Sequence, residues 1–155
     1  MDYKYSEGLN KVFKHSKEEA RRLKSEFLNT EHFLLGILKT DNSAKDILQT
    51  LNADLVQIRR KIETLNATTT SPFAYPSPNI SFTKMADQAL KRSELECRQY
   101  QSEEINTVHL LLGILYKLED PTSSILEAYD IDYEKVSSEY QLLLKNTGQA
   151  PKMSA

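Results

Sequence analysis

The sequence contains a single cysteine, Cys97, and no tryptophan among its 155 residues. One cysteine excludes an internal disulfide and a zinc site built on cysteine ligands. No apolar run approaches the roughly 20 residues that a membrane-spanning helix requires, and the first residues lack the apolar stretch of a signal peptide. We therefore expect a cytoplasmic protein without a membrane partner, in which Cys97 is a small buried side chain on a helix rather than a reactive thiol.

The sequence also lacks an excess of charge of either sign. Its 20 Lys and Arg residues and 22 Asp and Glu residues give a formal net charge of -2, and 39% of the residues are hydrophobic, as in ordinary globular domains. A surface that follows phosphates needs clustered Lys and Arg in excess, so we exclude nucleic acid as a partner. Basic spots at Arg21-Arg22 and at 59–61 are diluted by Glu19 and Glu63, and we predict that they are solvated helix faces.

Motifs of enzyme chemistry are missing as well. The sequence has no Gly-x-x-x-x-Gly-Lys-Ser/Thr phosphate loop, so we do not expect this chain alone to hydrolyse ATP. Serine and threonine are plentiful, but none stands in a glycine-framed nucleophile turn. We predict no catalytic residue, no metal and no cofactor in this chain, and we keep a histidine-dependent hydrolase as the remotest alternative.

What the sequence does contain is a long internal repeat. Residues 29–38 read NTEHFLLGIL and residues 106–115 read NTVHLLLGIL, so that His32 returns 77 residues later as His109. A repeat of this length with helical periodicity indicates two copies of one small helical unit. Because a unit of roughly 60 to 70 residues is marginal alone, the two copies are predicted to share one core in an all-α domain.

Helical periodicity runs through each copy. Apolar residues at three- and four-residue steps predict a first helix from Ser6, its N-cap, to about Lys24. The repeated motif forms a second, short helix whose apolar positions lie almost all round, as expected of an enclosed helix. Gly36 disfavours a helix by up to about 1 kcal/mol relative to alanine, so its return as Gly113 suggests the close approach of another backbone. Two further helices complete a four-helix unit.

The domain organisation follows from the proline-rich stretch between the copies. Residues 66–79 carry three prolines and a run of hydroxyl side chains, which suit neither a helix nor an interior strand. We predict one domain over 1–148, with repeat one at 3–65, this linker at 66–79 and repeat two at 80–145. Residues 149–155 are predicted to be a tail or the start of a linker to further modules.

The repeated elements resemble a known family. An aromatic residue followed by Ser or Thr opens each copy, as Tyr5-Ser6 and Phe82-Thr83, and a long helix then leads into each central motif. Over residues 3–145 this pattern resembles the double Clp N-terminal repeat of Hsp100/Clp AAA+ unfoldases, most of all the ClpC branch. The resemblance implies a pseudo-twofold bundle of about eight helices.

The resemblance also implies a function. Such a domain stands ahead of two ATPase modules, and it captures substrate proteins or docks adaptor proteins for unfolding. ATP and magnesium would belong to those missing modules, as would contact with a ClpP-type peptidase. The chain is then the recognition domain of a ClpC-like unfoldase, monomeric when isolated, or else a stand-alone adaptor without its own ATPase.

Resemblance to the ClpC branch further implies that phosphorylated arginine is recognised at the starts of the two central helices. Helix amides and the helix dipole favour the phosphoryl anion, while a carboxylate can hold the guanidinium. Thr30 and Glu31 match the first of these sites, with simple helix capping as the alternative. Thr107 matches the second, but Val108 replaces the acid, so we predict that the ligand uses the first site much better.

Two further predictions concern aromatic and histidine side chains. A groove between the repeats, edged by Tyr5 and Phe82, is the natural apolar contact for a partner, although aromatic residues at such positions also serve as core staples. His32 and His109 lack the spacing and the third ligand of a metal site. We predict that each is a structural histidine that donates to a backbone group or to the neighbouring repeat.

Overall fold

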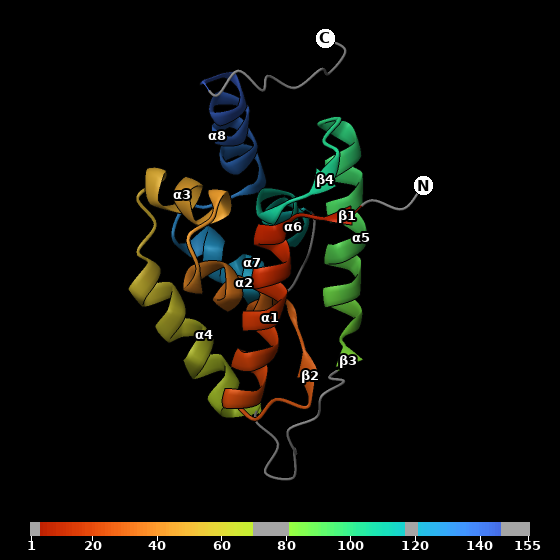
Figure 1. The fold of residues 1–155 in the computed structure, drawn as a ribbon. Coiled ribbons are helices and arrows are strands. Elements are labelled where there is room, and N and C mark those ends of the chain that lie inside the picture. The colour runs from red at the N-terminus through yellow and green to blue at the C-terminus, as the bar shows by residue number, and fades with distance from the viewer. Residues whose placement is uncertain (1–3, 70–80, 117–120, 147–155) are drawn as a thin grey trace.

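The computed structural model describes residues 4–69, 81–116 and 121–146, which form eight α-helices and four two-residue strands (Figure 1). The elements of the first repeat are, in order, β1 (Lys4–Tyr5), α1 (Glu7–Arg22), β2 (Phe27–Leu28), α2 (Thr30–Lys39), α3 (Ser43–Thr50) and α4 (Leu55–Thr69). Those of the second repeat are β3 (Ser81–Phe82), α5 (Lys84–Gln99), β4 (Glu104–Ile105), α6 (Thr107–Leu115), α7 (Pro121–Ala128) and α8 (Tyr133–Asn146). The identical order confirms the predicted all-α duplication of a four-helix unit.

The two central helices, α2 and α6, form the middle of one shared core. Every residue from Thr30 to Ile37 and every residue of α6 is buried. The long helix of each repeat packs on its own central helix, α1 on α2 and α5 on α6. In addition α2 contacts α5, α6 and α7, and α6 contacts α3. The prediction of enclosed central helices in a common core is therefore confirmed.

The short strands exchange partners between the repeats. β1 pairs in parallel with β4, with Tyr5 opposite Ile105, and β2 pairs in parallel with β3, with Leu28 opposite Phe82. Each strand pair therefore joins the opening residues of one repeat to the residues just before the central helix of the other (Figure 1). Hydrophobic periodicity did not predict these strands, because two residues are too short to show a pattern.

Two glycines allow the long and central helices of each repeat to touch. A Cβ atom built on Gly36 of α2 would lie 2.5 Å from both the carbonyl oxygen of Val12 and the hydroxyl oxygen of Ser16 on α1. The Ser16 hydroxyl donates to the same Val12 carbonyl at 2.7 Å, so a polar residue can interrupt the buried stripe of α1. Gly113 meets the backbone of α5 in the same way. The predicted close approach of a second backbone is confirmed.

One predicted boundary needs correction. α4 continues to Thr69, so residues 66–69 belong to the helix and not to the linker predicted at 66–79. The reason is that no helix breaker precedes the Ser71-Pro72 pair, where the residue before proline disfavours the helical conformation. The remainder of that linker, 70–79, and the predicted tail at 149–155 lie outside the described residues. No helix in the described ranges is both long and apolar enough to cross a membrane.

We expect Gly36→Ala to lower the free energy of unfolding by about 1–3 kcal/mol, the usual cost of forcing an extra methyl group into a packed contact. Gly8→Ala is the matched control, because a Cβ atom there has its nearest neighbours at 3.9 and 4.0 Å and alanine favours a helix over glycine. Urea unfolding followed by circular dichroism measures both variants. A Gly36→Ala variant as stable as the wild type would contradict the close contact.

Candidate functional site

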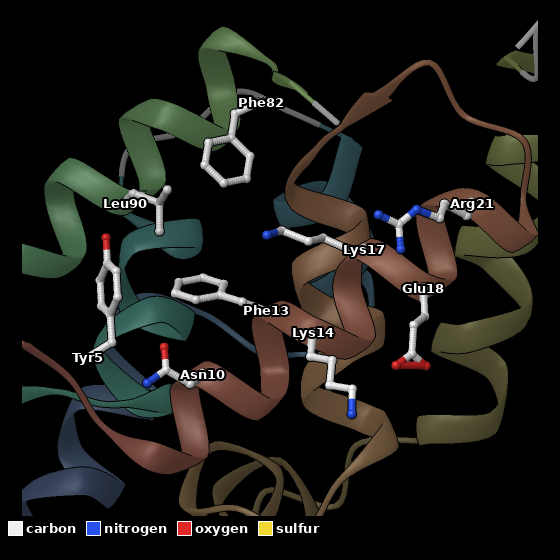
Figure 2. A pocket seen from close by; sticks show the side chains of 9 residues that line it. All are labelled: Tyr5, Asn10, Phe13, Lys14, Lys17, Glu18, Arg21, Phe82 and Leu90. Atoms are coloured by element: carbon white, nitrogen blue, oxygen red, sulfur yellow. The ribbon is translucent and has the colours of Figure 1, made fainter. Parts of the chain in front are cut away.

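A groove of about 500 Å³ lies between α1 and α5 (Figure 2). Its lining residues are Tyr5, Asn10, Phe13, Lys14, Lys17, Glu18, Arg21, Phe82 and Leu90. The structure thus brings together Tyr5 and Phe82, the two residues proposed from the sequence to edge a groove. Tyr5 is 41% exposed and Phe82 is 44% exposed, so neither is a core side chain.

The exchanged strands hold both aromatic residues in place. The amide of Ser6, directly after Tyr5, donates to the carbonyl of Ile105 at 2.8 Å. The amide of Thr83, directly after Phe82, donates to the carbonyl of Leu28 at 3.0 Å. Each groove-edging aromatic residue is therefore fixed by a backbone hydrogen bond to the other repeat, and the groove exists only where the repeats meet.

A row of aromatic rings connects the two edges of the groove. The ring centroids are 5.0 Å apart for Tyr5 and Phe13, 5.6 Å for Phe13 and Phe33, and 5.9 Å for Phe33 and Phe82. Phe33 is fully buried on α2, so the row is anchored in the core. Tilted and edge-on contacts at these distances are favourable arrangements of aromatic pairs. The groove floor is thus rigid and apolar.

The start of α2 carries the first predicted ion site, around Thr30 and Glu31. Thr30 is fully buried, and its hydroxyl donates to the hydroxyl of Thr122 on α7 at 2.9 Å. Glu31 is 5% exposed, and its carboxylate accepts from the side-chain amide of Asn29 at 2.9 Å. The side-chain oxygen of Asn29, Oδ1, in turn accepts from the Thr83 hydroxyl at 2.7 Å. The Thr30 hydroxyl thus joins the two repeats, a role that the sequence did not reveal.

A small pocket of about 190 Å³ adjoins the start of α2. Its lining residues are Ser25, Glu26, Phe27, Asn29, Glu31 and Thr83. Two acidic residues, Glu26 and Glu31, and the aromatic Phe27 therefore belong to the lining of one small space. Such a lining suits a cationic group such as a guanidinium.

The start of α6 differs from that of α2. Thr107 is 3% exposed, and its hydroxyl oxygen accepts from the backbone amide of Ala44 on α3 at 3.2 Å. Val108 is fully buried among apolar neighbours and offers no charge. Thr107 therefore joins the repeats as Thr30 does, while the second predicted ion site has no acid at position 108. Ligand binding at either position stays a prediction.

The two repeated histidines act as acceptors at the helix starts. Nδ1 of His32 accepts from the backbone amide of Asn29 at 2.9 Å, and Nδ1 of His109 accepts from that of Asn106 at 3.0 Å. The structural role predicted for both histidines is confirmed. The predicted direction of the hydrogen bond to the backbone was wrong, because the ring nitrogen accepts where we expected it to donate. A helix start offers unpaired N–H groups, so it requires an acceptor there.

His109 lies in a buried polar cluster of the second repeat. Because Nδ1 accepts, the proton of the neutral ring is on Nε2, which lies 3.2 Å from the hydroxyl oxygen of Tyr140. The side-chain amide of Asn106 donates to the same oxygen at 3.0 Å. Burial lowers the pKa of His109 to about 4, because a charged imidazolium would lose its hydration there.

A buried carboxylate lies beside the predicted basic spots of α1 and α4. Glu19 is 1% exposed, and its carboxylate lies 2.5 Å from Arg22 Nε and 3.4 Å from Arg59 Nη2. The solvated faces predicted for the basic spots hold at Arg22, Arg60 and Lys61, which are exposed. The neighbouring acid Glu19 is buried instead, and its contact with Arg59 ties α1 to α4. The fully buried Glu96 repeats Glu19 after 77 residues and accepts from the Tyr133 hydroxyl at 2.8 Å. That recurrence was the signal that could have identified both.

Cysteine and metal chemistry receive no support as the basis of the site. Cys97 is fully buried on α5, as predicted, and burial raises the pKa of its thiol. Among the residues that the structure describes, no three His, Cys, Asp or Glu side chains lie together as a set of metal ligands.

We expect the free energy of unfolding to fall as the pH decreases from 6.5 to 4, partly because of His109. In this range the unfolded chain binds a proton at His109 and the folded chain does not, so acid favours unfolding. At pH 4.5 this contributes roughly 2 kcal/mol, since one pKa unit corresponds to about 1.4 kcal/mol.

Urea unfolding at about pH 7 and about pH 4.5 tests this contribution. His109→Asn keeps an acceptor for the Asn106 amide and removes the titrating ring, so its stability should fall by less over this range than that of the wild type. Equal slopes for the wild type and His109→Asn would contradict the role of His109.

The duplicated helices define an all-α domain with a groove where its two copies meet. The chain belongs to the Clp N-terminal repeat family, since the model described as "Clp repeat (R) N-terminal domain" matches residues 4–129 and 81–153. This family assignment confirms the resemblance recognised in the sequence.

The curated relatives that match are longer proteins. The ATP-dependent Clp protease ATP-binding subunit ClpA homolog of Guillardia theta is 31% identical over 150 residues, which are 96% of this chain and 18% of that protein. The chloroplastic chaperone protein ClpC of Pisum sativum is 31% identical over 133 residues, which are 85% of this chain and 14% of that protein. The chain thus spans less than a fifth of the length of these curated relatives.

Solved structures share the fold. The Hsp104 N-terminal domain from Candida albicans matches with a TM-score of 0.76 and 16% identity, covering 97% of this chain and 96% of that chain. A complex of the ClpV N-domain with a VipB peptide matches with a TM-score of 0.64 and 14% identity, covering 94% of this chain and 96% of that chain. At these identities the comparison establishes the architecture and leaves the chemistry of the groove to this chain's own residues.

Proposed function

We propose that this chain is the substrate- and adaptor-recognition domain of a ClpC-like ATP-dependent unfoldase that serves a Clp protease. The groove between α1 and α5 carries the proposal, because half-exposed aromatic rings there offer an apolar surface anchored in a rigid core. Its occupant is a protein segment that inserts apolar side chains between Tyr5 and Phe82. The complex of a similarly folded ClpV N-domain with a peptide supports this kind of occupant.

The remaining parts of this function belong to other modules. Relatives named as ATP-binding subunits of a Clp protease support an unfoldase whose ATP, magnesium and ClpP-type peptidase contacts lie outside this chain. The recognition domain itself binds and releases segments without chemistry. We place it in the cytoplasm and expect the isolated domain to be monomeric.

Replacing a groove aromatic should weaken substrate binding. We expect Phe82→Ala to raise the dissociation constant for an unfolded model protein such as casein by about tenfold or more, as for truncation of a central aromatic anchor. Leu142→Ala is the control, since Leu142 is 50% exposed and lines neither this groove nor the pocket at the start of α2. Fluorescence anisotropy measures binding, and thermal melting verifies that each variant folds. Equal binding by both variants would argue against the groove.

Recognition of phosphorylated arginine is a second candidate function, favoured by the small acidic pocket at the start of α2. Glu31 and Glu26 would hold the guanidinium, while the first amides of α2 and its dipole would favour the phosphoryl group. Val108 supplies no acid at the equivalent place in the second repeat, so the proposal is for one site. The resemblance to the ClpC branch adds support from the family.

Calorimetric titration with phosphoarginine tests this second candidate. We expect a single site, and we expect Glu31→Gln to weaken binding by about tenfold or more, because a charge-assisted hydrogen bond contributes about 1.5–3 kcal/mol. Glu7→Gln is the control, since Glu7 is an exposed acid in the first turn of α1. Two equal sites, or undiminished binding by Glu31→Gln, would remove the candidate and leave the groove untouched.

A further inference from the structure

We propose that the groove between α1 and α5 selects segments in which an apolar side chain is flanked by aspartate or glutamate. The proposal rests on the proposed function, namely that this groove receives protein segments. It adds the chemistry of the preferred segment, with the acidic residues lying along α1.

The two walls of the groove differ in charge. All four of its ionisable groups other than the Tyr5 phenol come from α1, namely Lys14, Lys17, Glu18 and Arg21. The opposite wall contributes Phe82 and Leu90, which are apolar (Figure 2). Residues three and four positions apart on a helix face the same side, so the cations form one stripe along α1. A bound segment would therefore lie between an apolar wall and a cationic wall.

Two cations of this wall, Lys14 and Lys17, carry the argument for an acidic ligand. Among the described residues, neither Lys14 nor Lys17 forms an ion pair. The carboxylate of Glu18 lies 3.7 Å from His15 Nδ1. In Figure 2 the Glu18 carboxylate points away from the Lys17 ammonium group, which lies on the side of the groove floor. The single acid of the wall therefore does not neutralise Lys17.

The second repeat provides an internal comparison for Lys14. Its equivalent 77 residues later is Lys91, which pairs with Asp87 at 3.0 Å. The residue that corresponds to Asp87 in the first repeat is Asn10, a neutral residue that lines the groove. The acid that pairs with the lysine in the second repeat is thus absent from the first repeat, whose helix α1 lines the groove.

Lys17 also differs from its equivalent in the second repeat, because a cation stands where that repeat has an acid. Its equivalent is Glu94, which pairs with Arg98 at 3.8 Å. In the first repeat the arginine is kept as Arg21 while the acid becomes Lys17, so a cation stands beside a cation. Two positions of α1, Asn10 and Lys17, therefore lack acids that α5 carries. A segment that supplies acidic side chains would compensate for both.

The magnitude of the effect follows from the exposure of the wall. Exposed ion pairs contribute up to about 1 kcal/mol each, which is up to about fivefold in affinity, and salt screens them. The aromatic floor then provides most of the affinity, and the flanking charge provides the preference among apolar segments. We therefore expect selectivity that is moderate at low salt and small at high salt.

Matched peptides measure this preference. Three labelled peptides share one Leu-Phe centre in a Gly-Ser background and carry acidic, neutral or basic flanks, and a fourth carries acidic flanks without the apolar centre. By fluorescence anisotropy at about 50 mM salt we expect the acidic-flank peptide to bind about fivefold tighter than the neutral one, with the difference largely lost at about 300 mM. The fourth peptide should not bind. Equal affinity for acidic and neutral flanks would overturn the proposal, as would binding of the fourth peptide.

Variants that give positions 10 and 17 of α1 the charges of their equivalents in α5 test whether these positions cause the preference for acidic flanks. Asn10→Asp combined with Lys17→Glu should bring the ratio of the affinities for the acidic-flank and neutral peptides close to one. The control is Lys11→Glu, which reverses an exposed cation of the same helix that pairs with Glu7 outside the groove. Equal losses from the control and the double variant would mean that overall charge causes the preference, and would overturn the proposal.

The outcomes separate this inference from the proposed function. If all apolar peptides bind equally and Phe82→Ala weakens each of them, the acidic preference is overturned while the recognition groove stands. If no peptide binds the wild type, both are overturned. Self-association of the chain in sedimentation experiments that Phe82→Ala abolishes would place a second copy in the groove, and would also overturn the acidic segment as its occupant.

Discussion

The structure depends on the reciprocal pairing of its two repeats through their short strands. The backbone amide of Ser6, next to Tyr5, donates to the carbonyl of Ile105. The backbone amide of Thr83, next to Phe82, donates to the carbonyl of Leu28. The same meeting of repeats buries the threonine hydroxyls at the starts of α2 and α6. Strand pairing, helix starts and groove therefore all lie at the contact between the two repeats.

Much of the fold could be predicted, because the two copies report on each other. The recurrence of Gly36 as Gly113 showed that a helix-disfavouring residue was needed twice, and the structure supplies the reason in the backbone of the facing helix. The strands could not be predicted, because Tyr5 and Ile105 are far apart in the sequence and pair over two residues without a pattern. The length of α4 was underestimated because the run of hydroxyl residues that suggested a linker begins before Pro72, the first residue that breaks a helix.

The sequence predicted the aromatic residues at the edge of the candidate site, but it did not predict the surroundings of the charged residues. Tyr5 and Phe82 could be identified because they open the two copies at equivalent positions. Whether a charged residue is paired, buried or exposed depends on partners that the sequence does not place together. Glu19 was expected in water and lies in the interior, whereas Lys17, on the same helix, is exposed beside the groove. Glu19 could have been identified because an acid recurs there as Glu96 in the second repeat. Lys17 could have been identified because it replaces the acid that the second repeat carries at Glu94.

The exchanged strands also give the chain the geometry of a twofold dimer contained in one polypeptide. A single repeat would find its strand partner and the far wall of its groove only in another copy, so that its interface would be the same patch on both subunits. In a homodimer every substitution appears twice. Covalent fusion removes that constraint, and the asymmetric positions, Asn10 against Asp87 and Glu31 against Val108, are its consequence: a symmetric scaffold with one face free to specialise.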